Sequence, residues 1–197
     1  MYSVGITGGM GSGKTTFCST WERLGAKVVY ADQIARELME HDPGVRNAVI
    51  QAFGEESYTK QGLNKEWISR KAFKEGMVKT LNACVHPAVF RRIEEEKVQA
   101  EKEGYPLFGA EAALLLDQGR PAVLDVVIVI AASESKRVKR IQIRDGHDEK
   151  EIVQRMRTQM SQDKMILKAD RVIYNDGTVE ELEKKAGDIF SELSKGR

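Results

Sequence analysis

The stretch SVGITGGMGSGKTTFCSTW, residues 3–21, sets the architecture of this chain. It is rich in glycine, and its only charged side chain is Lys14. An apolar run over residues 2–7 leads into the glycines, and the residues after them place Phe17 and Trp21 on one helical face. The spacing predicts a strand, a glycine loop and a helix in immediate succession.

The loop carries the Walker A pattern, Gly8-x-x-x-x-Gly13-Lys14-Thr15. Glycines let the backbone curl around phosphate oxygens with its N–H groups pointing inward, at the positive end of a helix. The ammonium of Lys14 then reaches the β- and γ-phosphates, and the hydroxyl of Thr15 binds Mg²⁺, partly through water. A glycine-rich turn with an incidental lysine is disfavoured, because spacing and context agree. The predicted nucleotide contacts here are Gly8, Gly9, Met10, Gly11, Ser12, Gly13, Lys14, Thr15 and Thr16.

Composition narrows the function classes. The 197 residues are 41% hydrophobic and 31% charged with four prolines, which is ordinary globular usage. A net charge of +1 argues against a nucleic-acid partner and favours a small anionic ligand. The N-terminus lacks a signal pattern, and the longest apolar run, residues 126–132, is too short to span a bilayer. We expect a soluble cytoplasmic protein with no membrane partner; the oligomeric state is not indicated.

Four more short apolar runs predict strands, at residues 27–30, 106–110, 126–131 and 171–175. Several are apolar at successive positions, which is typical of parallel strands covered on both faces. The predicted fold class is α/β: a three-layer P-loop core with a five-stranded parallel sheet, a helical insertion and a helical lid.

Two segments interrupt the strands. Residues 33–104 are helix-prone and poor in strand signals, and their last helix is expected to begin around Pro87 and to end before Gly104. Residues 134–168 are rich in arginine and lysine and predict two helices with a break at residues 145–146. The predicted nucleotide-binding core comprises the rest, residues 1–32, 105–133 and 169–197.

Nucleotide binding alone does not fix the reaction, because the same loop serves GTPases, motors, transporters and kinases. No guanine-reading Asn-Lys-x-Asp is present, and VVYAD at 28–32 and LFGAE at 107–111 only half match the metal-binding strand of motors. They place Asp32 and Glu111 at the carboxyl ends of two strands, the edge where an open parallel sheet binds ligands. A phosphoryl acceptor is expected there.

Several motifs beyond the loop resemble those of the dephospho-coenzyme A (dephospho-CoA) kinases. They are VVYADQIARELM at 28–39, LNACVHPAV at 81–89, EAALLLD at 111–117, RDG at 144–146, RMRTQM at 155–160 and ADRVIYNDGT at 169–178. Two positions depart from the family pattern. Tyr30 stands where the family usually has another aspartate, and Lys65 stands where it has an arginine.

The resemblance implies ATP-dependent phosphorylation of the ribose 3′-hydroxyl of dephospho-CoA, which gives CoA and ADP in the final step of CoA synthesis. Residues 33–104 would bind the acceptor and residues 134–168 would form the lid. One alternative is a kinase of another small acceptor, such as a nucleoside monophosphate, although the Asp-Gly-Phe/Tyr-Pro-Arg segment of adenylate kinases is absent. The other is a nucleotide switch that transfers no phosphate.

Individual roles follow from these motifs. Asp32 is expected to orient the acceptor hydroxyl and take its proton, or to cap a helix, with Lys14 and Arg144 completing the catalytic set. Arg155 and Asn175 are expected to contact the nucleotide, with a turn as the alternative for Asn175. The predicted acceptor contacts are Thr7, Asp32, Lys65, Asn82, His86 and Glu111. The predicted solvated arginines are Arg137, Arg140 and Arg157.

Overall fold

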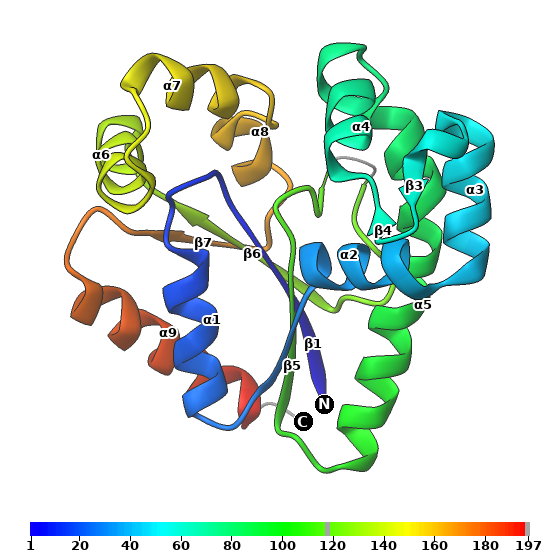
Figure 1. The fold of residues 1–197 in the computed structure, drawn as a ribbon. Coiled ribbons are helices and arrows are strands. Elements are labelled where there is room, and N and C mark those ends of the chain that lie inside the picture. The colour runs from blue at the N-terminus through cyan, green and yellow to red at the C-terminus, as the bar shows by residue number, and fades with distance from the viewer. Residues whose placement is uncertain (117–118, 196–197) are drawn as a thin grey trace. The chain divides into compact units, whose positions relative to one another are not determined.

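The computed structural model describes residues 1–116 and 119–195 (Figure 1). The chain divides into two compact units, one of Met1–Tyr30 with Glu96–Arg197 and one of Ala31–Glu95. None of the helices in the described ranges combines the length and apolar character that a membrane crossing requires. The assignment of 33–104 to acceptor binding and of 134–168 to a lid stays a prediction.

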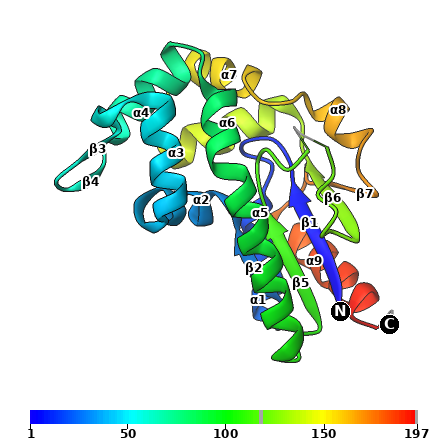
Figure 2. The same ribbon diagram turned by 90° about the vertical axis from the view of Figure 1, so that its right-hand side faces the viewer.

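The first unit is built on a five-stranded parallel sheet of order β2-β5-β1-β6-β7, which confirms the predicted fold class. Figure 2 shows β1, β5 and β6 running in the same direction. The sequence prediction differs from the structure only at the ends of β5 and β7. The strands are β1 (Tyr2–Thr7), β2 (Lys27–Tyr30), β5 (Leu107–Glu111), β6 (Val126–Ala131) and β7 (Arg171–Tyr174).

β1 lies at the centre of the sheet, between β5 and β6. Val4 is paired with Gly109 on one side and with Val126 on the other. The chain therefore builds the sheet on one side of β1 first and then crosses to the other side. Open parallel sheets bind ligands at such a switch point, beyond the carboxyl ends of the strands. The glycine loop follows β1 at this point.

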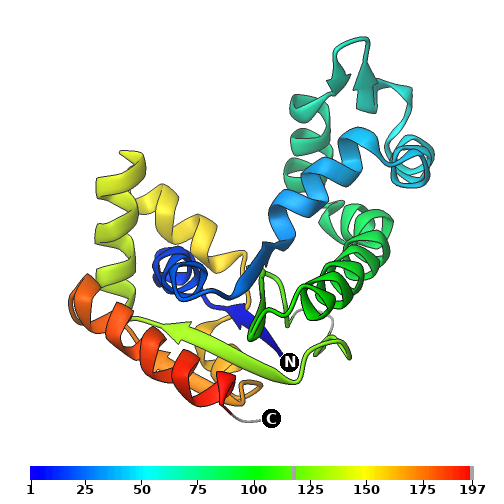
Figure 3. The ribbon, with the colours of Figure 1, turned by 90° about the horizontal axis from the view of Figure 1, so that it is seen from below.

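Helices α1 (Lys14–Arg23) and α9 (Val179–Ser194) lie side by side (Figures 1 and 3). α9 begins with an N-cap, because the Thr178 hydroxyl accepts a hydrogen bond of 3.3 Å from the backbone N–H of Glu181. Such caps satisfy backbone donors that have no partner inside the helix.

The arginine-rich segment folds as α6 (Glu134–Asp145), α7 (Glu149–Arg157) and α8 (Gln162–Ile166). The predicted break after residue 145 is confirmed, since Gly146 has a left-handed φ of 70° and ends α6. α8 was not predicted from the sequence. It spans only five residues, too few to display a helical period.

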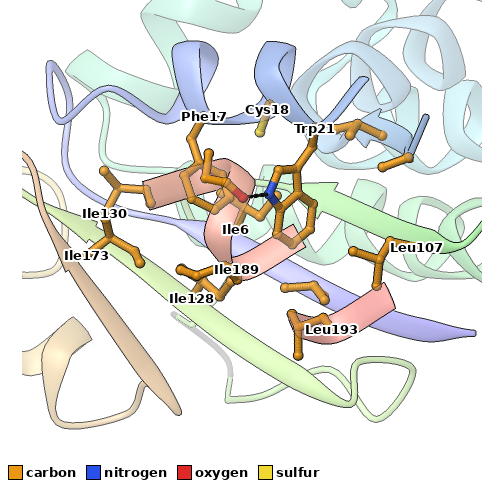
Figure 4. Packing of buried hydrophobic residues seen from close by; sticks show 14 of the residues in the cluster. Ile6, Phe17, Cys18, Trp21, Leu107, Ile128, Ile130, Ile173, Ile189 and Leu193 are labelled. Carbon is orange, nitrogen blue, oxygen red and sulfur yellow. Dashed lines mark hydrogen bonds between the residues drawn. The ribbon is translucent and has the colours of Figure 1, made fainter. Parts of the chain in front are cut away.

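The core between α1, α9 and the sheet is apolar (Figure 4). Phe17 and Trp21 of α1 are fully buried, with ring centroids 5.1 Å apart. The indole N–H of Trp21 donates a hydrogen bond of 2.9 Å to the carbonyl of Ala186 in α9. Trp21 therefore joins the two helices through both its ring and its donor.

The Trp21→Phe variant is expected to lower the free energy of unfolding by about 1–3 kcal/mol, because the Ala186 carbonyl loses its donor inside the core. Urea unfolding followed by circular dichroism measures this loss. Leu24→Ala, at a side chain 45% exposed just after α1, is the control and should change stability by less than about 0.5 kcal/mol. An equal loss in both variants would contradict the role given to the indole donor.

The second unit contains α2 (Ala31–His41), α3 (Pro43–Phe53), α4 (Lys65–Ser69), a π-helical turn (Arg70–Lys74) and the first part of α5 (Val78–Lys102). It also contains a short antiparallel hairpin, β3 (Tyr58–Thr59) and β4 (Gly62–Leu63), which the sequence did not predict. The hairpin is held from outside, since the Glu40 carboxylate accepts a hydrogen bond of 3.1 Å from the N–H of Leu63.

The expected helix start at Pro87 is wrong, because α5 runs without interruption from Val78 to Lys102 with Pro87 inside it. A proline in a helix removes the hydrogen bond to the carbonyl four residues earlier, which here belongs to Ala83. Both Ala83 and Pro87 are exposed, so water can bind that carbonyl. Val85, Ala88 and Val89 are buried and stabilise the helix around the break.

Candidate functional site

The glycine loop between β1 and α1 has a backbone that only glycine accommodates at its two ends. Gly8 has a φ of 149°, and a Cβ there would lie 2.2 Å from the carbonyl oxygen of Ile130. Gly13 has a φ of 105° and caps the N-terminus of α1 in a left-handed conformation. The loop therefore presents backbone amides at the positive end of a helix, the arrangement that binds phosphate.

Lys14, the first residue of α1, folds back over the loop. Its ammonium donates a hydrogen bond of 3.0 Å to the carbonyl of Gly8 and lies 3.7 Å from the carboxylate of Glu111 at the end of β5. The two side chains are only 14% and 13% exposed. Glu111, predicted as an acceptor contact, thus lies beside the lysine of the loop.

Asn175 and Arg140 brace the loop from behind. The buried Asn175 side chain donates a hydrogen bond of 2.7 Å to the carbonyl of Ser12, and a guanidinium nitrogen of Arg140 donates one of 3.0 Å to the carbonyl of Asn175. The prediction that Arg140 is solvated is therefore wrong. Arg140 is partly buried, and its guanidinium binds a backbone carbonyl just after β7. An adenine contact by Asn175 stays a prediction.

The prediction that Arg137 is solvated is also wrong, because the residue is buried and only 9% exposed. Its Nη1 would lie 2.3 Å from a Cβ built at Gly9, so the guanidinium packs directly on the loop. The loop is tied to the same region by Gln159, whose side-chain oxygen accepts a hydrogen bond of 3.0 Å from the N–H of Met10.

The other arginines of this region face solvent. Arg144 forms a bidentate pair with Asp145 at 2.7 and 2.8 Å, and this pairing lowers the pKa of the Asp145 carboxyl. Arg155 and Arg157 on α7 are exposed, as predicted for Arg157. A phosphate contact by Arg144 or Arg155 stays a prediction.

Two threonines that flank the glycine loop differ in exposure. Thr7 ends β1 and is 1% exposed, whereas Thr15 is exposed in the first turn of α1. No group of three or more His, Cys, Asp or Glu side chains suited to a metal occurs in residues 1–116 and 119–195. The exposed Thr15 hydroxyl is the predicted protein ligand at the loop, and a hard cation such as Mg²⁺ would add phosphate and water oxygens to it.

Tyr30, at the position where the resembling family has an aspartate, ends β2 opposite Glu111. Its hydroxyl donates a hydrogen bond of 3.1 Å to the Glu22 carboxylate. Burial and this neighbouring carboxylate raise the pKa of Tyr30, so the phenol stays neutral. No second carboxylate therefore stands at residue 30.

In the second unit, Asp32 is exposed in the first turn of α2, and Lys65 is exposed as the first residue of α4. Asn82 and His86 lie one turn apart on α5 and share a face. The His86 ring packs edge-on against Phe90, with 5.8 Å between centroids.

Nδ1 of His86 is buried and meets no hydrogen-bond partner among the described residues. The side chain therefore has a free polar atom for a ligand. Asp117, which ends the EAALLLD motif, lies outside the described residues.

Comparison with known proteins places these features in a family. The family model described as dephospho-CoA kinase matches residues 2–181. The dephospho-CoA kinase of Salinibacter ruber is 38% identical over 199 residues and covers all of both chains. That of Chlorobaculum tepidum is 36% identical and covers 96% of this chain and 94% of its own.

Solved structures agree on the fold. The structure of TT1252 from Thermus thermophilus has a TM-score of 0.80 at 28% identity and covers 98% of this chain and 97% of its own. A dephospho-CoA kinase from Campylobacter jejuni has a TM-score of 0.73 at 24% identity, covers 98% of each chain and supports the fold alone.

Proposed function

The chain belongs to the dephospho-CoA kinase family, and we infer that it transfers the terminal phosphoryl group of ATP to the ribose 3′-hydroxyl of dephospho-CoA. The products are CoA and ADP, and the reaction is the final step of CoA synthesis. The observation that carries this conclusion is the match of one family model to residues 2–181, which hold both the glycine loop and Asp32. We further propose a cytoplasmic location, with neither nucleic acid nor a membrane as a partner.

The glycine loop supports ATP as the donor. Backbone amides from Gly8 to Thr15 would enclose the phosphates, and Lys14 would exchange the Gly8 carbonyl for phosphate oxygens. Glu111 lies 3.7 Å from the ammonium, so it can keep Lys14 oriented while the phosphates enter. Phosphoryl transfer needs little covalent help from a protein, and positioning with charge neutralisation supplies most of the rate.

We propose Mg²⁺ as the accompanying cation, held by the Thr15 hydroxyl and partly through water. The exposed hydroxyl beside Lys14 fits this role, because Mg²⁺ prefers oxygen ligands and keeps several waters. When bound, the ion neutralises charge on the phosphate oxygens.

We propose acceptor contacts from residues of each unit. We propose that Asp32 accepts a hydrogen bond from the 3′-hydroxyl and takes its proton as the phosphoryl group arrives. His86 supports acceptor binding, since its Nδ1 is buried without a partner in the described residues. The further acceptor contacts that we propose are Thr7, Lys65, Asn82 and Glu111.

Acceptor selectivity tests the function. Purified protein with ATP and Mg²⁺ is given dephospho-CoA, AMP or shikimate, and ADP release is followed. We expect release only with dephospho-CoA, together with a product phosphorylated at the 3′ position. A response to AMP instead would favour a nucleoside monophosphate kinase. Equal, unstimulated rates with all three would favour a nucleotide switch and overturn the proposed reaction.

A further inference from the structure

We propose that Arg137 is a phosphate-binding residue whose guanidinium donates hydrogen bonds to the terminal phosphoryl group of the bound nucleotide. This assignment rests on the proposed function and identifies a residue that binds the transferring phosphoryl group. It assigns this contact to an arginine that is already fixed in place, and it does not require the exposed Arg144 or Arg155.

Arg137 is largely buried and forms no direct ion pair with any of the described residues. The residue is 9% exposed, and its Nε meets no hydrogen-bond partner in the described residues. No carboxylate in the described ranges lies within ion-pair distance of it. Glu134, one turn earlier on α6, is exposed and acts on the guanidinium only from a longer distance. Burial lowers the pKa of Arg137 and the charge of Glu134 offsets part of that effect, but a guanidinium stays protonated in proteins. A largely buried charge with no carboxylate in direct contact is costly, so an anionic ligand is the expected partner.

Backbone packing fixes Arg137 on the glycine loop. Its Nη1 would lie 2.3 Å from a Cβ built at Gly9, and its carbonyl oxygen would lie 2.7 Å from one built at Gly11. The first turn of α6 therefore rests directly on the loop, and a side chain at either glycine would push it away. The cation is therefore held beside the glycine loop by α6 itself.

The position along the loop selects the terminal phosphate. Lys14, which reaches β- and γ-phosphates in such loops, places its ammonium at the carbonyl of Gly8. Arg137 places Nη1 at the next residue, Gly9. The opposite end of the loop leads into α1, whose amides hold the inner phosphates. Both cations therefore flank the end where the transferring group lies.

Space for a ligand adjoins the guanidinium. A hollow of about 460 Å³ lies between α6, α7 and α8. Its lining includes Arg137 and Gln159 and also the carboxylates of Glu134 and Asp163. Gln159 also holds the N–H of Met10, so the hollow adjoins the glycine loop.

The test compares ATP and ADP binding by calorimetry, with Mg²⁺ and without acceptor, in the parent protein and in Arg137→Met. Methionine keeps an unbranched side chain and removes the charge. We expect the Kd for ATP to rise about tenfold to hundredfold, the range of hydrogen bonds to charged groups, and that for ADP to rise less than about threefold. The melting temperature without nucleotide should stay equal or rise, because a buried unpaired charge is gone.

Lys139→Met, at an exposed position of α6, removes the same charge and should bind both nucleotides like the parent. Arg137→Lys should fold and retain part of the preference for ATP. Unchanged ATP binding in Arg137→Met overturns the proposal. Failure of this variant to fold, or an equal loss of affinity for ATP and ADP at a lowered melting temperature, also overturns it, because either result would show that Arg137 only stabilises the fold. If the parent itself binds no nucleotide, the proposed function fails instead.

Discussion

Replacing Lys14 with methionine is expected to lower the turnover number with dephospho-CoA by about a thousandfold or more, because a cation aimed at the transferring group is worth about 10³–10⁵ in rate. In the structure its ammonium donates a hydrogen bond to the Gly8 carbonyl, and the Lys14 side chain is 14% exposed. A methionine fills similar space but cannot neutralise the charge that spreads over the phosphate oxygens in transfer. Steady-state kinetics at saturating ATP measures the effect.

Lys184→Met is the matched control for this variant. Lys184 is exposed on α9, and its replacement by methionine changes the net charge of the protein by the same amount as Lys14→Met. The Lys184→Met variant should keep the turnover number of the parent. This result would show that the effect of Lys14→Met comes from the charge at the loop and not from the change in net charge. If Lys14→Met retained turnover within about tenfold of the parent, the loop would not hold the transferring phosphate.

The loop could be predicted from the sequence because its chemistry is local. A glycine at residue 8 is required where a Cβ would meet the carbonyl of Ile130, and Gly13 is required where α1 begins with a positive φ. Lys14 and Thr15 then follow at fixed spacing. The strands were predictable for a similar reason, since apolar runs reflect burial on both faces of a parallel sheet.

The arginines of α6 could not be assigned from spacing. Residues 137, 140 and 144 share one side of a helix by their i, i+3, i+7 spacing, but the pattern does not say what covers that side. In the structure the first turns of α6 meet Gly9 and the end of β7, whereas Arg144 at the last turn faces solvent. Contacts between segments far apart in the chain decide each role, and no local signal carries them.

Pro87 illustrates the same limit for secondary structure. Its local preference is the first turn of a helix, and the sequence prediction followed it. Burial of Val85 and Val89 on either side stabilises a continuous α5, and one lost backbone hydrogen bond at an exposed position does not outweigh it. Lys65, which stands where the family has an arginine, is exposed, and nothing in the structure explains this difference.

Asp32→Asn is expected to lower turnover about 10²–10⁴-fold, or about 3–5 kcal/mol of transition-state stabilisation, while ATP affinity stays near that of the parent. Asparagine keeps the size and the hydrogen-bonding capacity of the side chain but cannot take the proton of the ribose hydroxyl. Single-turnover kinetics with bound ATP reports the chemical step, and calorimetry reports ATP affinity. A parallel loss of ATP affinity would place Asp32 at the donor and not at the acceptor.

The competing role of Asp32 is to stabilise the N-terminus of α2, in whose first turn it lies. A carboxylate there contributes only about 0.3–1 kcal/mol through the helix dipole, so that role predicts a small fall in melting temperature and little change in turnover. Glu37→Gln, an exposed carboxylate-to-amide change later in α2, is the matched control and should leave turnover unchanged. Near-normal turnover in Asp32→Asn with a lowered melting temperature would assign the residue to the helix end, because proton transfer cannot proceed through an amide.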